Sequence, residues 1–196
     1  GLGDVYKRQR RYYAALNKVA RTDTGQTEVY KIELLMKQAK ITTDDRKVTV
    51  AAKERAEQLG VPTAAVELPD GIIVTSKTTD FLGASAALLL NALKHLSGIS
   101  HETRLIKPEA IEPIQELKVK YLGGKNPRLH TDEVLIALTL AASSDANAKA
   151  ALEHLPMLKG CQVHTSVMLS EVDIKIFKKL GMELTSEPIQ TSKKVY

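Results

Sequence analysis

The stretch that decides the fold is TAAVELPDGIIVTSKTTDFLGASAALLLNALKHL, residues 63–96. Two runs of β-forming residues, 63–68 and 72–76, flank Pro69-Asp70-Gly71. Proline fixes its φ angle and glycine permits a positive φ, so these three residues favour a tight turn. The segment from Phe81 to Leu96 is apolar around most of its helical circumference, which is typical of a helix between a sheet and another layer. The stretch therefore predicts a β-hairpin followed by a buried helix.

The sequence beyond this helix alternates helical and strand-like patterns up to its end. Helices are expected over 109–120, from a cap at Thr131 to about 142, from a cap at Ser144 to about 155, and over 170–180; strands are expected at 105–106, 162–169 and 182–185. Strands separated by helices indicate a sheet covered on both faces. The predicted fold class is α/β, with a three-layer αβα domain over 61–196 and a mixed or mostly parallel sheet.

The preceding residues show helical periodicity alone. Three helices are expected, over 10–20, 27–39 and 44–59, with Gly60 as the stop of the third. Short helices bury little surface by themselves, so residues 10–60 are interpreted as a partial helical domain that leans on another. Residues 1–9, GLGDVYKRQ, lack this periodicity and resemble a non-native, adapter-like tract.

Composition and charge limit the classes of function. The 196 residues include 28 Lys+Arg and 23 Asp+Glu, and 43% are hydrophobic, which is typical of a soluble globular chain. Basic residues of the first 60 positions are interleaved with glutamates at helical spacing, so no specific nucleic-acid partner is expected. The richest apolar segment, 81–96, is too short and too polar to cross a membrane, and no signal peptide is visible. A cytoplasmic location is expected, without membrane association.

Two constellations invite an enzymatic interpretation that their context disfavours. Cys161 and His164, or His130 with the acidic residues after it, invite a zinc site, but positions 161 and 164 of a strand face opposite ways. A hydrolytic triad could combine Ser85 or Ser166 with His130 or His164, yet the G-x-S-x-G elbow is missing. Neither a metal site nor a nucleophilic serine is predicted, and Cys161 is interpreted as a small buried residue.

Anion binding is the better local hypothesis. Residues 75–79, Thr-Ser-Lys-Thr-Thr, join a strand to a helix N-terminus, where free N–H groups and the helix dipole favour a phosphate or carboxylate. A second basic cluster precedes another helix start. The candidate anion-binding residues are Lys77, Thr78, Lys125, Arg128 and His130. His130 is also the candidate proton donor or acceptor, and the alternative left open is that all five are ordinary caps and solvated loop residues.

Long segments of the sequence resemble a known family, the uncharacterised bacterial proteins termed UPF0371 or DUF1846. The segments are ELPDGIIVTSKTTDFLGASAALLLNALKHL (67–96), IEPIQELKVKYLGGKNPRLHTDEVLIAL (111–138) and LKGCQVHTSVMLSEVDIKIFKKLGMELTSEP (158–188). RRYYAALNKV and KIELLMKQAKITTDDRKV are similar to the segment just upstream in that family. The resemblance thus covers nearly everything from Arg10 onward.

The resemblance implies that the sequence is the C-terminal part of a longer chain. The family's N-terminal half carries a glycine-rich, phosphate-loop-like segment, so a nucleotide is expected in that missing half and no cofactor in this part. Where the family often has Thr-Gly-Lys-Thr, residues 75–78 are Thr-Ser-Lys-Thr, and the lost glycine weakens the anion-loop hypothesis. The family supplies no established catalytic residues.

Two function hypotheses follow from these observations. The chain is the substrate-side part of a nucleotide- or phospho-ligand-dependent enzyme, with the missing half and an anionic small molecule as partners. Alternatively, it is a structural or homo-oligomerisation region without chemistry of its own. Convergence of Lys77, Lys125, Arg128 and His130 on one concave surface would favour the first hypothesis.

Overall fold

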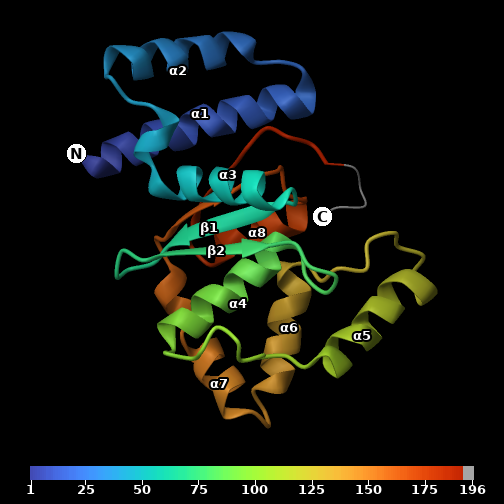
Figure 1. Cartoon of the computed structure of the whole chain (residues 1–196). Helices are drawn as coiled ribbons and strands as arrows, with labels where there is room; N and C mark the ends of the chain where they lie inside the picture. The colour runs from blue at the N-terminus through green and yellow to red at the C-terminus, as the bar shows by residue number, and fades with distance from the viewer. Residues whose placement is uncertain (192–196) are drawn as a thin grey trace.

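The chain folds into a four-stranded sheet with helices on both faces (Figure 1), and the computed structural model describes residues 1–191. The helices are α1 (Leu2–Thr22), α2 (Gln26–Gln38), α3 (Lys47–Leu59), α4 (Ala84–Leu96), α5 (Pro108–Glu116), α6 (Thr131–Ala141), α7 (Ala146–Glu153) and α8 (Glu171–Lys179). The strands are β1 (Thr63–Glu67), β2 (Ile73–Lys77), β3 (Gln162–Thr165) and β4 (Glu183–Ser186). Shorter turns are the 3-10 helices η1 (Thr43–Asp45) and η3 (Leu155–Leu158) and the π-helical η2 (Leu117–Tyr121). The predicted α/β class is confirmed.

The sheet is mixed and has the strand order β2-β1-β3-β4. β1 runs antiparallel to both β2 and β3, whereas β3 and β4 are parallel. The predicted hairpin is confirmed: Gly71 has a φ of 83°, and its N–H donates to the Leu68 carbonyl at 2.8 Å. Because β1 alone is reversed, the carboxyl ends of β2, β3 and β4 lie at one end of the sheet.

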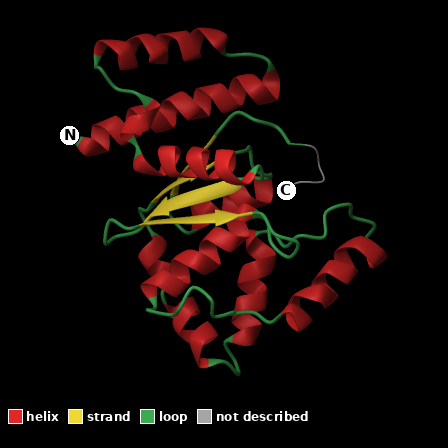
Figure 2. Ribbon diagram, in the orientation of Figure 1, coloured by secondary structure: helices red, strands yellow, loops and turns green. Residues whose placement is uncertain are grey.

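The alternation of side chains along β1 divides the core into two layers. Figure 2 shows helices above and below the strands. Ala65 packs against Val48 and Ala52 of α3, on one face. Ala64 and Val66 point to the other face, into the larger core that α4, α6, α7 and α8 share. The three-layer αβα arrangement follows from this division, with α3, which precedes residue 61, as the layer on one face.

The N-terminal helices form a hairpin on the α3 side of the sheet. α1 and α2 pack through a small cluster of their own, which contains Ala15, Val29, Ile32 and Met36. α1 begins at Leu2, eight positions before the start expected at Arg10, and the Tyr6 hydroxyl donates to Glu67 of β1 at 3.2 Å. Residues 1–9 thus contact the sheet, while their interpretation as an adapter-like tract stays a prediction.

Some local expectations were wrong. Leu105 and Ile106 are buried in the main core but form no strand, since two apolar residues alone do not distinguish a strand from buried coil. His130 and not Thr131 is the N-cap of α6, and Asp145 instead of Ser144 caps α7 by accepting from the Ala148 N–H. β3 ends at Thr165 because the chain turns there toward α8.

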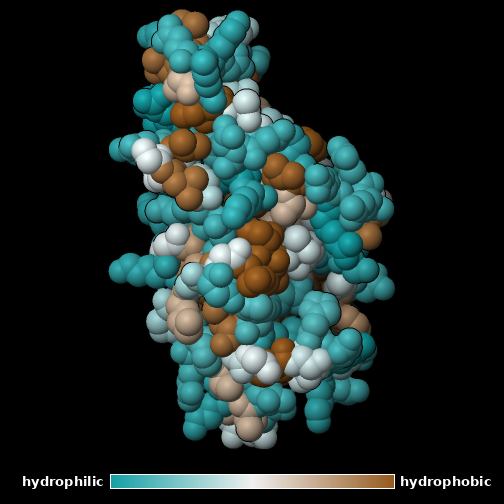
Figure 3. Space-filling model, turned by 60° about the vertical axis from the view of Figure 1, so that its left-hand side comes forward, coloured by the Kyte–Doolittle hydropathy of each residue, from teal (hydrophilic) through white to brown (hydrophobic). Residues whose placement is uncertain are grey.

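The face shown in Figure 3 is mainly hydrophilic, with limited apolar patches. On the face shown, brown side chains lie near the top, over the α1–α2 hairpin, and at the height of the sheet. Tyr30, Leu34 and Leu35 of α2 are exposed by 68%, 57% and 49%. None of the helices in residues 1–191 has both the length and the apolar character needed to span a bilayer.

Candidate functional site

The candidate site lies at the end of the sheet where β2, β3 and β4 finish. The loop after β2 leads into α4, and the loop after β3 leads into α8. A short parallel bridge between Leu82 and Leu129 holds the start of α6 beside the start of α4, and the Gly83 N–H donates to the Leu129 carbonyl at 3.2 Å. Ligands of open α/β sheets bind beyond the carboxyl ends of the strands, so this end is where a site is expected.

A small pocket occupies the junction of these elements. It is lined by the start of β1, the end of β3 and the N-terminal residues of α4, α6 and α8, including Thr78, Ser85, His130 and Asp173. Its volume of about 20 Å³ admits one water-sized group. Ser85 is only 4% exposed, and its hydroxyl has no hydrogen-bond partner. A buried hydroxyl without a partner costs stability, so a polar group that enters the pocket and hydrogen-bonds to Ser85 would be favoured.

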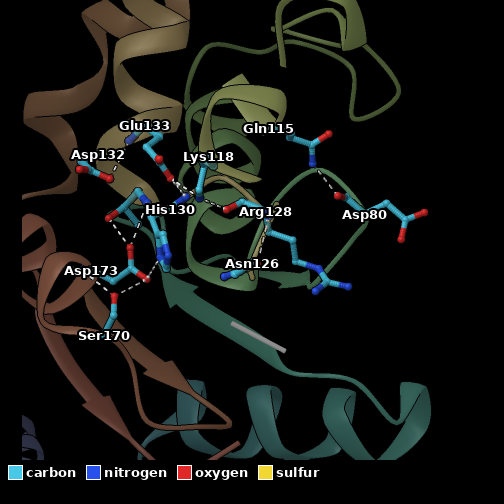
Figure 4. A network of polar contacts seen from close by, with 11 residues as sticks. Asp80, Gln115, Lys118, Asn126, Arg128, His130, Asp132, Glu133, Ser170 and Asp173 are labelled. Carbon is cyan, nitrogen blue, oxygen red and sulfur yellow. Dashed lines mark hydrogen bonds and ion pairs between the residues drawn. The ribbon is translucent and has the colours of Figure 1, made fainter. Parts of the chain in front are cut away.

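His130 and Asp173 form the polar centre of this pocket (Figure 4). His130 Nδ1 lies 3.2 Å from Asp173 Oδ2. The other carboxylate oxygen, Oδ1, accepts from the Thr131 N–H at 2.9 Å and from the Thr131 hydroxyl at 2.6 Å. The Ser170 hydroxyl donates to Oδ2 at 3.3 Å. The carboxylate therefore fixes the imidazole from Nδ1, which leaves Nε2 as the atom able to exchange a proton with a ligand.

The electrostatic environment couples the two groups. The hydrogen bond to Asp173 raises the pKa of His130 above its ordinary value, against an opposing effect of burial. Burial alone would raise the pKa of Asp173, but its hydrogen bonds with His130 and Thr131 outweigh burial and hold that pKa below its ordinary value. Asp173 is therefore ionised at neutral pH and favours the imidazolium form of His130.

A second set of contacts fixes the backbone of His130. The His130 N–H donates to Glu133 Oε1 at 2.8 Å, and Lys118 Nζ lies 2.7 Å from the same oxygen. Lys118 Nζ also donates to the Arg128 carbonyl. Lys118 belongs to the π-helical turn η2, so this irregular turn directs an ammonium group at the start of α6. The helix start that presents His130 is thereby tied to η2.

The structure separates the predicted anion-binding residues. Thr78 and His130 line the small pocket together, as the hypothesis requires. Lys77 lines a different cavity, and the exposed Lys125 lines neither that cavity nor the small pocket. Arg128 Nε donates to the Thr79 carbonyl at 2.6 Å, and Figure 4 shows its side chain directed away from the His130–Asp173 pair. The predicted residues therefore do not all converge on one concave surface.

Sequence reasoning missed two residues of the small pocket. Asp173 was visible only as the partner of Ser170 in a capping pattern, a role that it also performs, because its N–H donates to the Ser170 hydroxyl at 3.4 Å. Nothing in the sequence connects it with His130, 43 positions away. The sequence suggests Ser85 as a packed or back-bonded helix residue and disfavours it as a nucleophile; its unpartnered hydroxyl in the pocket lining is not predicted.

The residues considered for a metal site do not come together. In the described part of the chain, no group of three or more His, Cys, Asp or Glu side chains could hold a metal ion. Cys161 is buried, and burial raises the pKa of its thiol. His164 lies on the other side of β3, where its Nδ1 is 2.7 Å from the Thr185 hydroxyl and its Nε2 is 3.4 Å from Glu187.

Comparison of the sequence with known proteins assigns the chain to a family. Residues 44–196 match the C-terminal model described as "Domain of unknown function DUF1846". The chain belongs to the DUF1846 family. A UPF0371 protein of Corynebacterium urealyticum is 50% identical over 187 residues, and one of Streptococcus uberis is 46% identical over 187 residues. Each alignment covers 95% of this chain but only 38% of the relative, so the chain spans well under half the length of these DUF1846 relatives.

Proposed function

We propose that this region is the substrate-side part of an enzyme that acts on a phosphorylated or otherwise anionic small molecule. In this proposal one oxygen of the ligand enters the small pocket, and His130 donates a proton to it or accepts one from it. Asp173 orients the imidazole and stabilises its protonated form. The pocket volume of about 20 Å³ implies that the body of the ligand stays outside the pocket.

The observation that carries the proposal is the His130–Asp173 pair inside a pocket formed by helix N-termini. An aspartate bound to Nδ1 of a histidine fixes the tautomer and stabilises the imidazolium, as general acid–base catalysis requires. The first N–H groups of α4 and the positive ends of the helix dipoles favour a negatively charged oxygen at the same place. The unpartnered Ser85 hydroxyl supplies a further donor for that oxygen.

The proposal includes the rest of the longer protein as a partner. The relatives are much longer than the matched region, so we place a nucleotide that reacts at the His130 pocket in the part that this chain does not cover. We place the reaction in the cytoplasm and assign no membrane or nucleic-acid partner to it. Of the predicted anion ligands, Thr78 and His130 keep a direct role, and Arg128 acts by anchoring the loop that contains Thr79.

A thermal-shift series tests this function. Inorganic phosphate and sugar phosphates at millimolar concentration should raise the melting temperature of the chain, because a ligand that binds only the folded state stabilises it. His130→Gln should reduce the shift, whereas His95→Gln, which changes a histidine on the far end of α4, should retain it in full. No stabilisation by any anion, or an equal shift in both variants, would contradict the proposal.

A second candidate function is assembly. Tyr30, Leu34 and Leu35 project from one helix, α2, and are about half exposed or more, which is unusual for large apolar side chains so close together. If α2 pairs with a second copy, light scattering should give a mass above that of a monomer, and Leu34→Glu should restore the monomer. A monomeric wild-type chain would exclude self-assembly through α2.

A further inference from the structure

A larger cavity lies outside the small pocket, along the open edge of β2. It is bounded by β2, α4, the start of α5 and residues 101–106, and its volume is about 600 Å³. Cavities of this size commonly hold small-molecule ligands. Apart from Lys77, none of the predicted anion-binding residues lines it.

The cavity is rich in cations from separate elements. Arg55 of α3, Lys77 of β2 and Arg104 of the 101–106 segment line it and are exposed. No carboxylate within residues 1–191 forms an ion pair with any of these three side chains. Asp80 and Glu102 also line the cavity, so three exposed cations stand against two carboxylates, and positive charge predominates.

A fourth cation stabilises the shape of the cavity. Lys94 Nζ donates to the carbonyls of His101 and Thr103 at 2.8 and 3.3 Å, which fixes the segment that carries Arg104. The floor between the cations is apolar and includes Phe81, Leu90 and Leu105. Such a lining suits a ligand with an apolar body and more than one negative charge.

The open edge of β2 does not favour a peptide strand as the occupant. Asn91 Nδ2 of α4 donates to the Thr75 carbonyl at 3.1 Å, in the middle of the five-residue strand. This bond occupies one of the few backbone groups that an added strand would need. Two guanidinium groups instead match the planar, bidentate contacts that phosphate oxygens accept.

We infer that this cavity binds an organic phosphate, a ligand with an apolar or aromatic body and at least two negative charges, as in a nucleoside diphosphate. The phosphates contact Arg55, Lys77 and Arg104, and the apolar body lies on Phe81 and Leu90. This site is separate from the small pocket that contains His130 and Asp173. It accounts for Lys77, whose side chain lies apart from the other predicted anion ligands.

Isothermal titration of the 196-residue chain with ADP, pyrophosphate and adenosine tests the inference. ADP should bind with an affinity at least about tenfold higher than either pyrophosphate or adenosine, since only ADP uses both the cations and the apolar floor. Pyrophosphate binding as tightly as ADP would show that the floor is not used and would overturn the inference. Absence of saturable ADP binding would overturn it as well.

Variants locate the binding. Lys77→Ala and Arg104→Ala should each weaken ADP binding by about tenfold, as expected for a lost charge-assisted contact. Lys31→Ala, an exposed lysine of α2 away from the cavity, is the matched control and should bind as the wild type does. Thr103→Trp, which leaves the backbone carbonyl that Lys94 uses, should block the cavity while circular dichroism shows an unchanged fold. Unweakened binding in Lys77→Ala and Arg104→Ala would overturn the assignment to this cavity.

Discussion

Asp173 Oδ2 and His130 Nδ1 lie 3.2 Å apart, although 43 positions separate the two residues in the sequence. One stands in the first turn of α8 and the other caps α6, so a single ion pair links the starts of two helices. The same pair faces the pocket at the carboxyl end of the sheet. The contact therefore has a structural role and a chemical one, and mutations can distinguish them.

Asp173→Asn should lower the pKa of His130 toward its ordinary value of 6.5, because the amide keeps the size of the carboxylate but not its charge. The variant should also lose about 1.5 to 3 kcal/mol of unfolding free energy, the range for hydrogen bonds to a charged group. Histidine NMR titration and urea unfolding give the two values. Asp132→Asn changes a neighbouring carboxylate that accepts from the Glu133 N–H at 2.8 Å, and it should leave the pKa of His130 nearly unchanged; an equal effect of both variants would contradict the account.

The stability of the chain should fall as the pH decreases below about 6.5, through His164. Burial lowers the pKa of His164 in the folded protein, so the unfolded chain binds a proton more readily. The contribution of this group is fully present above the ordinary value of 6.5 and decreases as the pH falls toward the lowered value. His130 acts in the opposite sense, since its raised pKa gives a contribution that is present below 6.5 and is lost as the pH rises.

Urea unfolding between about pH 5 and 8 separates the two histidines. His164→Gln should reduce the loss of stability on the acid side, whatever its effect on stability at neutral pH. Asp173→Asn should reduce the loss that His130 causes on the basic side. An unchanged acid slope in His164→Gln would show that other groups cause it.

Arg46 should be the most sensitive cationic position of the fold. Its guanidinium is fully buried and donates to the carbonyls of Val163 and Glu183 at 3.1 and 2.8 Å, so it connects the start of α3 with β3 and β4. Burial lowers the pKa of Arg46 to about 10, and because this value is still well above 7, the guanidinium is charged at neutral pH. Arg46→Ala leaves these buried acceptors without a donor and should cost about 3 kcal/mol or more. Lys47→Ala, the exposed neighbour, should change the stability by less than about 0.5 kcal/mol in the same urea titration.

Arg128→Ala should release the loop after β2. The bond from Arg128 Nε to the Thr79 carbonyl is 2.6 Å long, and its loss should cost about 1.5 kcal/mol and speed hydrogen exchange over residues 79–83. Lys125→Ala, an exposed lysine in the loop before α6 that also contains Arg128, is the matched control and should change neither quantity. Unaltered exchange in Arg128→Ala would show that the loop is held by other contacts.

Local chemistry explains which parts of the structure could be predicted. The hairpin around Gly71 and the buried helix after it depend on turn residues and on apolar periodicity, both of which are visible in one sequence. The burial of Arg46 could not be predicted, because a cation at a helix start is usually exposed. The π-helical turn could not be predicted either, because such turns are rare. Likewise, the association of Asp173 with His130 depends on how α6 and α8 pack, which periodicity does not specify.

The most direct test of the central claim is the NMR titration of His130 with and without inorganic phosphate. If an anion binds where His130, Ser85 and the start of α4 meet, phosphate should raise the pKa of His130 further and shift the amide signals of residues 84–86. In Asp173→Asn the effect on the pKa should become smaller, because the imidazole is no longer oriented. An unchanged pKa of His130 in saturating phosphate, with no shift at residues 84–86, would contradict the account.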